Sequence, residues 1–133
     1  MFCHPIAASF NAQVARAVCA SVAAPEHELW FHDLYREEFG PVLAENEYRS
    51  KYSLDSAVQD YMDQVVEADV MVFVHPDWWG QVPALLKGWL DRVFRPGIAY
   101  DYVGEEFLPK HRELPLAGKK AIAYCTTDAG EDG

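Results

Sequence analysis

The segment Val70–Val74, which reads VMVFV, constrains the fold of this chain more than any other segment. Five consecutive apolar residues have no polar face, so a strand built from them must be covered on both sides, as in a parallel sheet. Apolar residues at helical spacing run from Phe10 to Val22, from Leu54 to Val66 and from Leu85 to Phe94. Helices that alternate with apolar strands predict an α/β fold, with a doubly wound parallel sheet between two helical layers.

Local signals set the expected limits of these elements. Ser9 is the expected N-cap of the first helix, and Pro25 ends it. The polar segment Glu45–Ser53 is expected to be exposed. Further strands are expected at Met1–Cys3, as a short stub, at Leu29–Phe31, and at Ala121–Cys125, as a second buried strand.

Length and charge exclude several classes of protein. A chain of 133 residues has room for one domain, spanning residues 1–133. Acidic residues outnumber basic ones 21 to 11, which argues against nucleic acid as a partner and leaves backbone and hydroxyl donors to hold any phosphate. No apolar run approaches the roughly 20 residues of a membrane span, and the start has no secretory signal, so the cytoplasm is expected.

The cysteines do not suggest a metal site. Cys3, Cys19 and Cys125 lie far apart, without a C-x-x-C pair. Each falls in an apolar segment, where a reduced cysteine packs as a small hydrophobic residue.

Three loops follow the predicted strands at their carboxyl ends, where open parallel sheets bind ligands. They read HPIAASFN, HPDWWGQV and TTDAGEDG, and together they would form one pocket. In the first loop, Ser9, Asn11 and the free N–H groups of the helix start suit an anion, although Ser9 on its own is more often only a cap.

The aromatic residues and histidines near these loops allow two interpretations. Trp89 is expected in the core, whereas Trp78 and Trp79 either pack in the core or stack on a flat ligand. His4 and His75, each before a proline at a strand end, are either structural or part of the pocket. Tyr100 and Tyr102 form either a surface turn or the lid of a pocket.

Longer motifs resolve some of these alternatives by resemblance. The chain contains HPxxxSFN at His4–Asn11, DLYREEFGPVL at Asp33–Leu43 and PxWWGxVPALLKGWLDRVFRPGIAYDY at Pro76–Tyr102. With these motifs it resembles the flavodoxin-like NAD(P)H:quinone oxidoreductase family. That family also includes azoreductases, nitroreductases and ancillary subunits of bacterial potassium-efflux systems.

The resemblance implies a role for each loop. The first loop would contact the flavin phosphate, the second would line the isoalloxazine, the third would close over the pyrimidine side of the ring, and the two tyrosines would border the substrate. The implied cofactor-binding residues are His4, Ser9, Phe10, Asn11, Pro76, Asp77, Trp78, Trp79, Gly80, Thr126, Thr127, Asp128, Ala129 and Gly130, and the substrate-binding residues are Tyr100 and Tyr102.

The sequence departs from the family pattern in two places. Asp128 and Ala129 stand where the pattern has paired glycines after the threonines. The tyrosine and histidine that assist hydride transfer in the family correspond to positions after Gly133, so no residue here is assigned their catalytic role. The fifth strand of the fold is likewise expected to be missing from this sequence.

The implied activity is the two-electron reduction of quinones or similar aromatic acceptors by NAD(P)H, by a ping-pong mechanism in a homodimer. FAD is the expected flavin, with FMN as the alternative. A competing interpretation is a non-catalytic subunit of the potassium-efflux type, or a degenerate flavodoxin-like interaction module.

Overall fold

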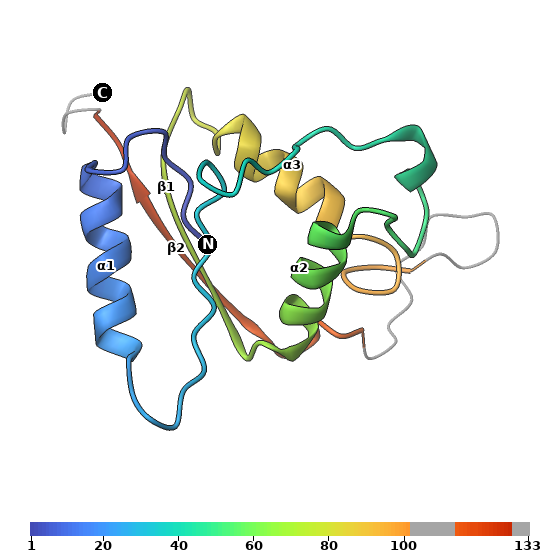
Figure 1. Ribbon diagram of the computed structural model, residues 1–133, viewed down its shortest axis with the longest axis horizontal. Helices are drawn as coiled ribbons and strands as arrows, with labels where there is room; N and C mark the ends of the chain where they lie inside the picture. Colours follow the sequence, from blue (N-terminus) through green and yellow to red (C-terminus); the bar gives the residue numbers. More distant parts are fainter. Residues whose placement is uncertain (102–113, 129–133) are drawn as a thin grey trace.

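The computed structural model describes residues 1–101 and 114–128 and shows helices on both sides of a parallel sheet (Figure 1). The predicted helices and the two longer strands are present, with bounds within a few residues of those expected. The elements are α1 (Phe10–Val22), a short 3-10 helix η1 (Glu45–Glu47), α2 (Ser56–Glu67), β1 (Val70–Pro76), α3 (Ala84–Val93) and β2 (Lys120–Thr126).

The sheet is parallel, with β1 in its middle. β1 pairs with β2 in a register that runs from Val70 opposite Lys120 to Pro76 opposite Thr126. On the other side of β1, Phe2 forms parallel bridges to both Val74 and Asp33. Four segments therefore lie side by side, in the order Asp33, Phe2, β1 and β2.

The strand predicted at Leu29–Phe31 is wrong. The backbone hydrogen bonds to Phe2 come instead from the residues that follow this segment. Phe2 N–H donates to the His32 carbonyl (2.8 Å), and Leu34 N–H donates to the Phe2 carbonyl (3.1 Å). Residues 29–31 form no backbone bridge to any other described residue, although the Phe31 ring stacks on that of Phe2.

Alternate side chains of β1 point into two apolar clusters. Val72 and Val74 pack with Phe2 and with α1, whereas Met71 and Phe73 pack on the side of α2 and α3. Figure 1 shows α1 on one side of the strands and the other two helices on the opposite side. The continuous apolar run thus has the two-sided cover that it predicted.

Trp89 of α3 occupies the centre of the larger cluster. Only 2% of its surface is exposed, and its ring meets those of Tyr61, Phe73 and Phe94 edge-on, with centroids 5.6–5.9 Å apart. Such arrangements add to the stabilisation from burial alone. The expected core position of Trp89 is confirmed.

The prediction that Ala121–Cys125 is buried is wrong. Ile122 and Tyr124 of β2 are exposed, and so is Cys125. Within the described residues, the apolar clusters that cover β1 include no residue of β2. An apolar sequence predicts a strand correctly here, but it does not say whether a covering layer is present.

The expectation that Glu45–Ser53 is exposed fails at two residues. Glu47 is 5% exposed, and Ser53 is buried beside it. Arg92 of α3 donates from Nε and Nη2 to the Glu47 carboxylate at 3.0 and 3.1 Å, and the Ser53 hydroxyl also donates to it. Glu47 is buried because a cation 45 residues later in the sequence pairs with it.

Helix α2 begins two residues later than its apolar pattern suggests. Asp55 is the N-cap, and its carboxylate accepts a hydrogen bond from Ala57 N–H at 3.0 Å. Leu54 precedes the cap and is exposed, so it does not belong to the apolar face of the helix. None of the helices in the described ranges has the length and apolar character to span a bilayer.

Candidate functional site

The three predicted loops meet at the carboxyl ends of β1 and β2. The rings of His4 and Trp78 lie 6.4 Å apart, which brings the first loop against the second. Thr126, the last residue of β2, accepts hydrogen bonds from Asn11 Nδ2 (2.8 Å) and from Asp77 N–H (2.7 Å). In Figure 1 the start of α1 and the ends of both strands lie at the same edge of the molecule.

The first loop presents the amino end of α1. The Ser9 hydroxyl accepts a hydrogen bond from Ala12 N–H at 3.1 Å, so Ser9 is the helix cap. Within the described residues, Phe10 N–H and Asn11 N–H have no hydrogen-bond acceptor, as expected for the first turn of a helix. These two donors, at the positive end of the helix dipole, can bind an anion.

His4 has a defined tautomer in its neutral form. Its Nδ1 accepts a hydrogen bond from Ile6 N–H at 3.0 Å, which leaves the ring proton on Nε2. Nε2 is therefore a donor from the same loop that carries the helix start. His75 is different: it is buried in β1, and its Nδ1 lies 2.9 Å from the Pro76 carbonyl oxygen.

The second loop forms a strained turn. Trp78 and Gln81 exchange two backbone hydrogen bonds of 3.0 and 3.2 Å, and the two residues between them, Trp79 and Gly80, have φ of 60° and 73°. Positive φ at both central positions is the pattern of a type I′ turn, which favours Asn, Asp or Gly. Trp79 adopts this unfavourable backbone while its side chain is fully exposed, at 101%.

Two buried polar atoms beside this turn lack partners. Asn11 Oδ1 and Asp77 Oδ1 have no hydrogen bond within the described part of the chain. Unpaired buried acceptors are uncommon in folded proteins and call for a specific reason.

Sequence reasoning missed a cation at the first loop. Arg36 donates from Nη2 to the Pro5 carbonyl at 3.0 Å, which holds an exposed guanidinium beside the loop. Its sequence signal is only its place within DLYREEF, in a segment that the sequence marked as an irregular connection. The contact appears because Asp33 pairs with Phe2 and brings the two loops together.

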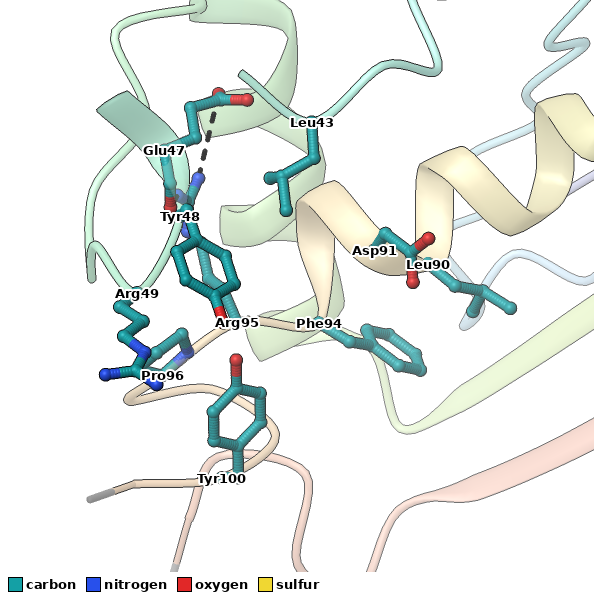
Figure 2. Close-up of a pocket in the computed structure, with 10 residues that line it drawn as sticks. All are labelled: Leu43, Glu47, Tyr48, Arg49, Leu90, Asp91, Phe94, Arg95, Pro96 and Tyr100. Atoms are coloured by element: carbon teal, nitrogen blue, oxygen red, sulfur yellow. Dashed lines mark hydrogen bonds and ion pairs between the residues drawn. The ribbon is translucent and has the colours of Figure 1, made fainter. Parts of the chain in front are cut away.

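Tyr100 lies at the other end of α3 from Trp79. It lines a pocket of about 470 Å³ together with Tyr48, Arg95 and residues of the last turn of α3. The hydroxyl ends of Tyr48 and Tyr100 point toward one another across this pocket (Figure 2). A ten-residue helix is about 15 Å long, so one chain does not bring Tyr100 to the Trp79 turn.

The remaining predicted site residues fall at the end of the third loop or outside the described ranges. Thr127 and Asp128 follow β2 and are exposed. Tyr102, Ala129 and Gly130 lie outside the described residues.

The family model for the flavodoxin-like fold matches residues 1–133. The chain belongs to this family. Its sheet order, with Phe2 between Asp33 and β1, agrees with this assignment.

Known relatives include enzymes that act on NAD(P)H. An uncharacterised NAD(P)H oxidoreductase of Haemophilus influenzae is 33% identical over 103 residues, which is 75% of this chain and 51% of the relative. NAD(P)H dehydrogenase [quinone] 1 of Cavia porcellus is 29% identical over 147 residues, covering 96% of this chain and 52% of the relative. The chain thus spans about half the length of these curated relatives.

A solved structure of an NAD(P)H:quinone oxidoreductase also resembles this chain. The NAD(P)H:quinone oxidoreductase from Methanothermobacter marburgensis superposes with a TM-score of 0.79 at 31% identity, covering 98% of this chain and 64% of that one. The fold is therefore shared with a quinone oxidoreductase over almost the whole of this chain.

Proposed function

We propose that the chain is a flavin-dependent NAD(P)H:quinone oxidoreductase that reduces quinones or related aromatic acceptors. The observation that carries the proposal is the turn at Trp79, where a strained backbone holds an indole fully in solvent at the carboxyl end of β1. Strain of this kind clusters at ligand sites, because it otherwise only costs stability. The names of the relatives supply the class of reaction.

The residues present fit a flavin. The N–H groups at the start of α1 suit its phosphate, with the His4 Nε2 proton and the Arg36 guanidinium in neighbouring segments. Trp78 and Trp79 offer aromatic faces for a ring, and the unpaired Asp77 Oδ1 lies in the same loop. FAD is the proposed flavin, with FMN as the alternative, and the proposed contacts are those given above for His4–Asn11, Pro76–Gly80 and Thr126–Gly130.

A bound flavin would supply the hydride chemistry, passing two electrons from NAD(P)H to the acceptor. The residues of this chain bind and orient it. The Trp78–Gln81 turn would stack against the ring and keep water from one side of it, and the loop after β2 would supply backbone N–H donors. We place the reaction in the cytoplasm and assign it a ping-pong order, in which the oxidised nicotinamide leaves before the acceptor enters.

The separation of Tyr100 from Trp79 supports a homodimer. If Tyr100 borders the acceptor, the ring that it meets has to be bound by the second copy. The residues that line the pocket with Tyr100 include the exposed apolar side chains of Leu43 and Tyr48. Sedimentation of the flavin-bound protein at micromolar concentration tests this: a purely monomeric species would contradict the two-chain site.

The decisive experiment is reconstitution. Purified protein is mixed with FAD, passed through a desalting column, and mixed without oxygen with NADH or NADPH. We expect the protein to retain the yellow colour, to lose it with one of the nucleotides, and to regain it when a quinone is added. A protein that stays colourless, or a flavin that the nucleotides do not bleach, would overturn the proposal.

One observation favours the non-catalytic alternative. The exposed Ile122 and Tyr124 on β2 suit an interaction module that binds another protein. Such a module would remain colourless in the same reconstitution, so that experiment separates the two functions.

A further inference from the structure

Thr126 is the point at which all three loops of the site are joined. Its hydroxyl oxygen accepts a hydrogen bond from Asn11 Nδ2 at 2.8 Å, which connects it to α1. Its carbonyl oxygen accepts one from Asp77 N–H at 2.7 Å, which connects it to the loop after β1. Thr126 itself ends β2, so three segments meet at one residue.

The Asn11 side chain is directed inward. Asn11 is 3% exposed, its amide nitrogen is used by Thr126, and its amide oxygen is buried. Its neighbour Phe10, in the same helical turn, is 66% exposed. A ligand at the start of α1 would therefore meet the backbone N–H of Asn11 rather than its enclosed amide.

We propose that the side chains of Asn11 and Thr126 form a positioning pair, which sets the distance between the start of α1 and the Trp78–Gln81 turn and leaves contact with the cofactor to the backbone of these residues. This inference rests on the proposed function. A ligand that places a phosphate at α1 and a ring at Trp79 has to satisfy both places at once. Fixing their separation beforehand removes part of the ordering cost of binding.

The proposal distinguishes ligands with and without a phosphate. FAD would use both ends of the site, so its affinity depends on their spacing. Riboflavin has the same ring but no phosphate, so it would bind only at the turn. Loss of the positioning pair should therefore weaken FAD binding much more than riboflavin binding.

The chemistry of the pair provides matched variants. Thr126→Val keeps the shape of the side chain but removes the acceptor, and Asn11→Leu removes the donor. The double variant Asn11→Leu/Thr126→Val replaces the polar pair with an apolar one and leaves no unpaired donor. Thr126→Ser keeps the hydroxyl, and Ser21→Ala, at the far end of α1, is the control.

The experiment measures the Kd of FAD and of riboflavin by flavin fluorescence, with the melting temperature of each flavin-free variant. We expect each single variant to raise the Kd of FAD about tenfold and to change that of riboflavin less than about twofold. The double variant should regain the melting temperature lost by the single variants but not the FAD affinity. Thr126→Ser and Ser21→Ala should bind FAD like the unmodified chain.

Three results would overturn the inference. They are single variants that keep their FAD affinity, equal losses for FAD and riboflavin, and a double variant that regains affinity along with stability. The last two would mean that the pair only stabilises the fold. If the unmodified chain binds neither flavin, the proposed function fails and this inference fails with it, whereas flavin binding that is insensitive to the variants removes the inference alone.

Discussion

Helix α3 and the turn before it contain the same kind of residue in opposite environments. Before the start of the helix, Trp79 is fully exposed on a left-handed backbone. Within the helix, Trp89 is 2% exposed and contacts three aromatic rings. The helix thus connects a region built for burial with a region that leaves aromatic surface in solvent.

The two ends also differ in their charged groups and in their backbone. At the buried end, Arg92 reaches Glu47, Asp55 (2.9 Å) and the Gly40 carbonyl (2.7 Å). Buried atoms without a hydrogen bond occur at both ends within the described residues, Trp89 Nε1 and Arg95 Nη1 at the buried end and Asn11 Oδ1 and Asp77 Oδ1 at the exposed end. What sets the exposed end apart is the strained turn at Trp79, and strain of this kind is typical of a ligand site.

The largest expected effect is the contrast between the two tryptophans. Trp89→Ala leaves a cavity in the core and should lower the free energy of unfolding by about 3–5 kcal/mol. Trp79→Ala should change it by no more than about 0.5 kcal/mol, while weakening FAD binding through the loss of about 0.5–1.5 kcal/mol of stacking. Urea unfolding and FAD titration measure both quantities. A benign Trp89→Ala together with an unfolded Trp79→Ala would reverse our assignment of core and site.

The next effect concerns acid stability at the buried end. Burial alone raises the pKa of Glu47, but hydrogen bonds from Arg92 and Ser53 and the charge of Arg92 outweigh it and lower the pKa from 4.5 to about 2. A carboxylate with a lowered folded-state pKa stabilises the fold above its unfolded pKa, and this contribution is lost as the pH falls from about 4.5 to about 2. The loss is at most about 3 kcal/mol.

Unfolding free energies measured from pH 6 to pH 2 on the unmodified chain and on Glu47→Gln test this prediction. We expect the variant to be less stable at pH 6 and to lose less stability on acidification. Parallel pH profiles for the two proteins would show that another group controls the acid transition.

Two glycines also differ in what a larger side chain would meet, one in crowded surroundings and one on a backbone with positive φ. A Cβ on Gly88 would lie 2.2 Å from the Pro41 carbonyl oxygen, so Gly88→Ala should cost about 1–3 kcal/mol or more. Gly80 has open space around it but a φ of 73°, so Gly80→Ala should cost about 1 kcal/mol from backbone strain.

Gly118→Ala is the control for Gly80, because Gly118 also has positive φ and open space but lies outside the three loops. Both variants should lose similar stability in urea unfolding, and only Gly80→Ala should weaken FAD binding. Equal FAD affinity for these two variants would argue that the turn is not part of the cofactor site.

The sequence predicted the elements that depend on local patterns. Ser9 caps α1 as expected, and the apolar run at Val70–Val74 lies within β1. The meeting of the three loops followed from a general rule about strand ends. Predictions failed where distant partners decide the outcome. Glu47 is buried only because Arg92 reaches it, and no apolar cluster of the described residues covers Ile122 and Tyr124 of β2.

The link between Asn11 and Thr126 shows the same limit within the site. Both residues were expected at the cofactor, but their hydrogen bond joins positions 115 residues apart, and no local pattern indicates it. The strain at Trp79 was equally hidden, since a tryptophan before glycine does not by itself predict a type I′ turn.

The smallest expected effect tests whether the backbone conformation of Trp79, at the exposed end, lowers the stability of the fold. Asn-Gly is the favoured pair at the centre of a type I′ turn, so Trp79→Asn should relieve the strain that Trp79→Ala leaves in place. We expect Trp79→Asn to be more stable than Trp79→Ala by up to about 1 kcal/mol in urea unfolding, while both variants bind FAD more weakly than the unmodified chain. If the two variants are equally stable, the positive φ at Trp79 carries no cost, and the strain that supports a ligand site at this end of α3 is absent.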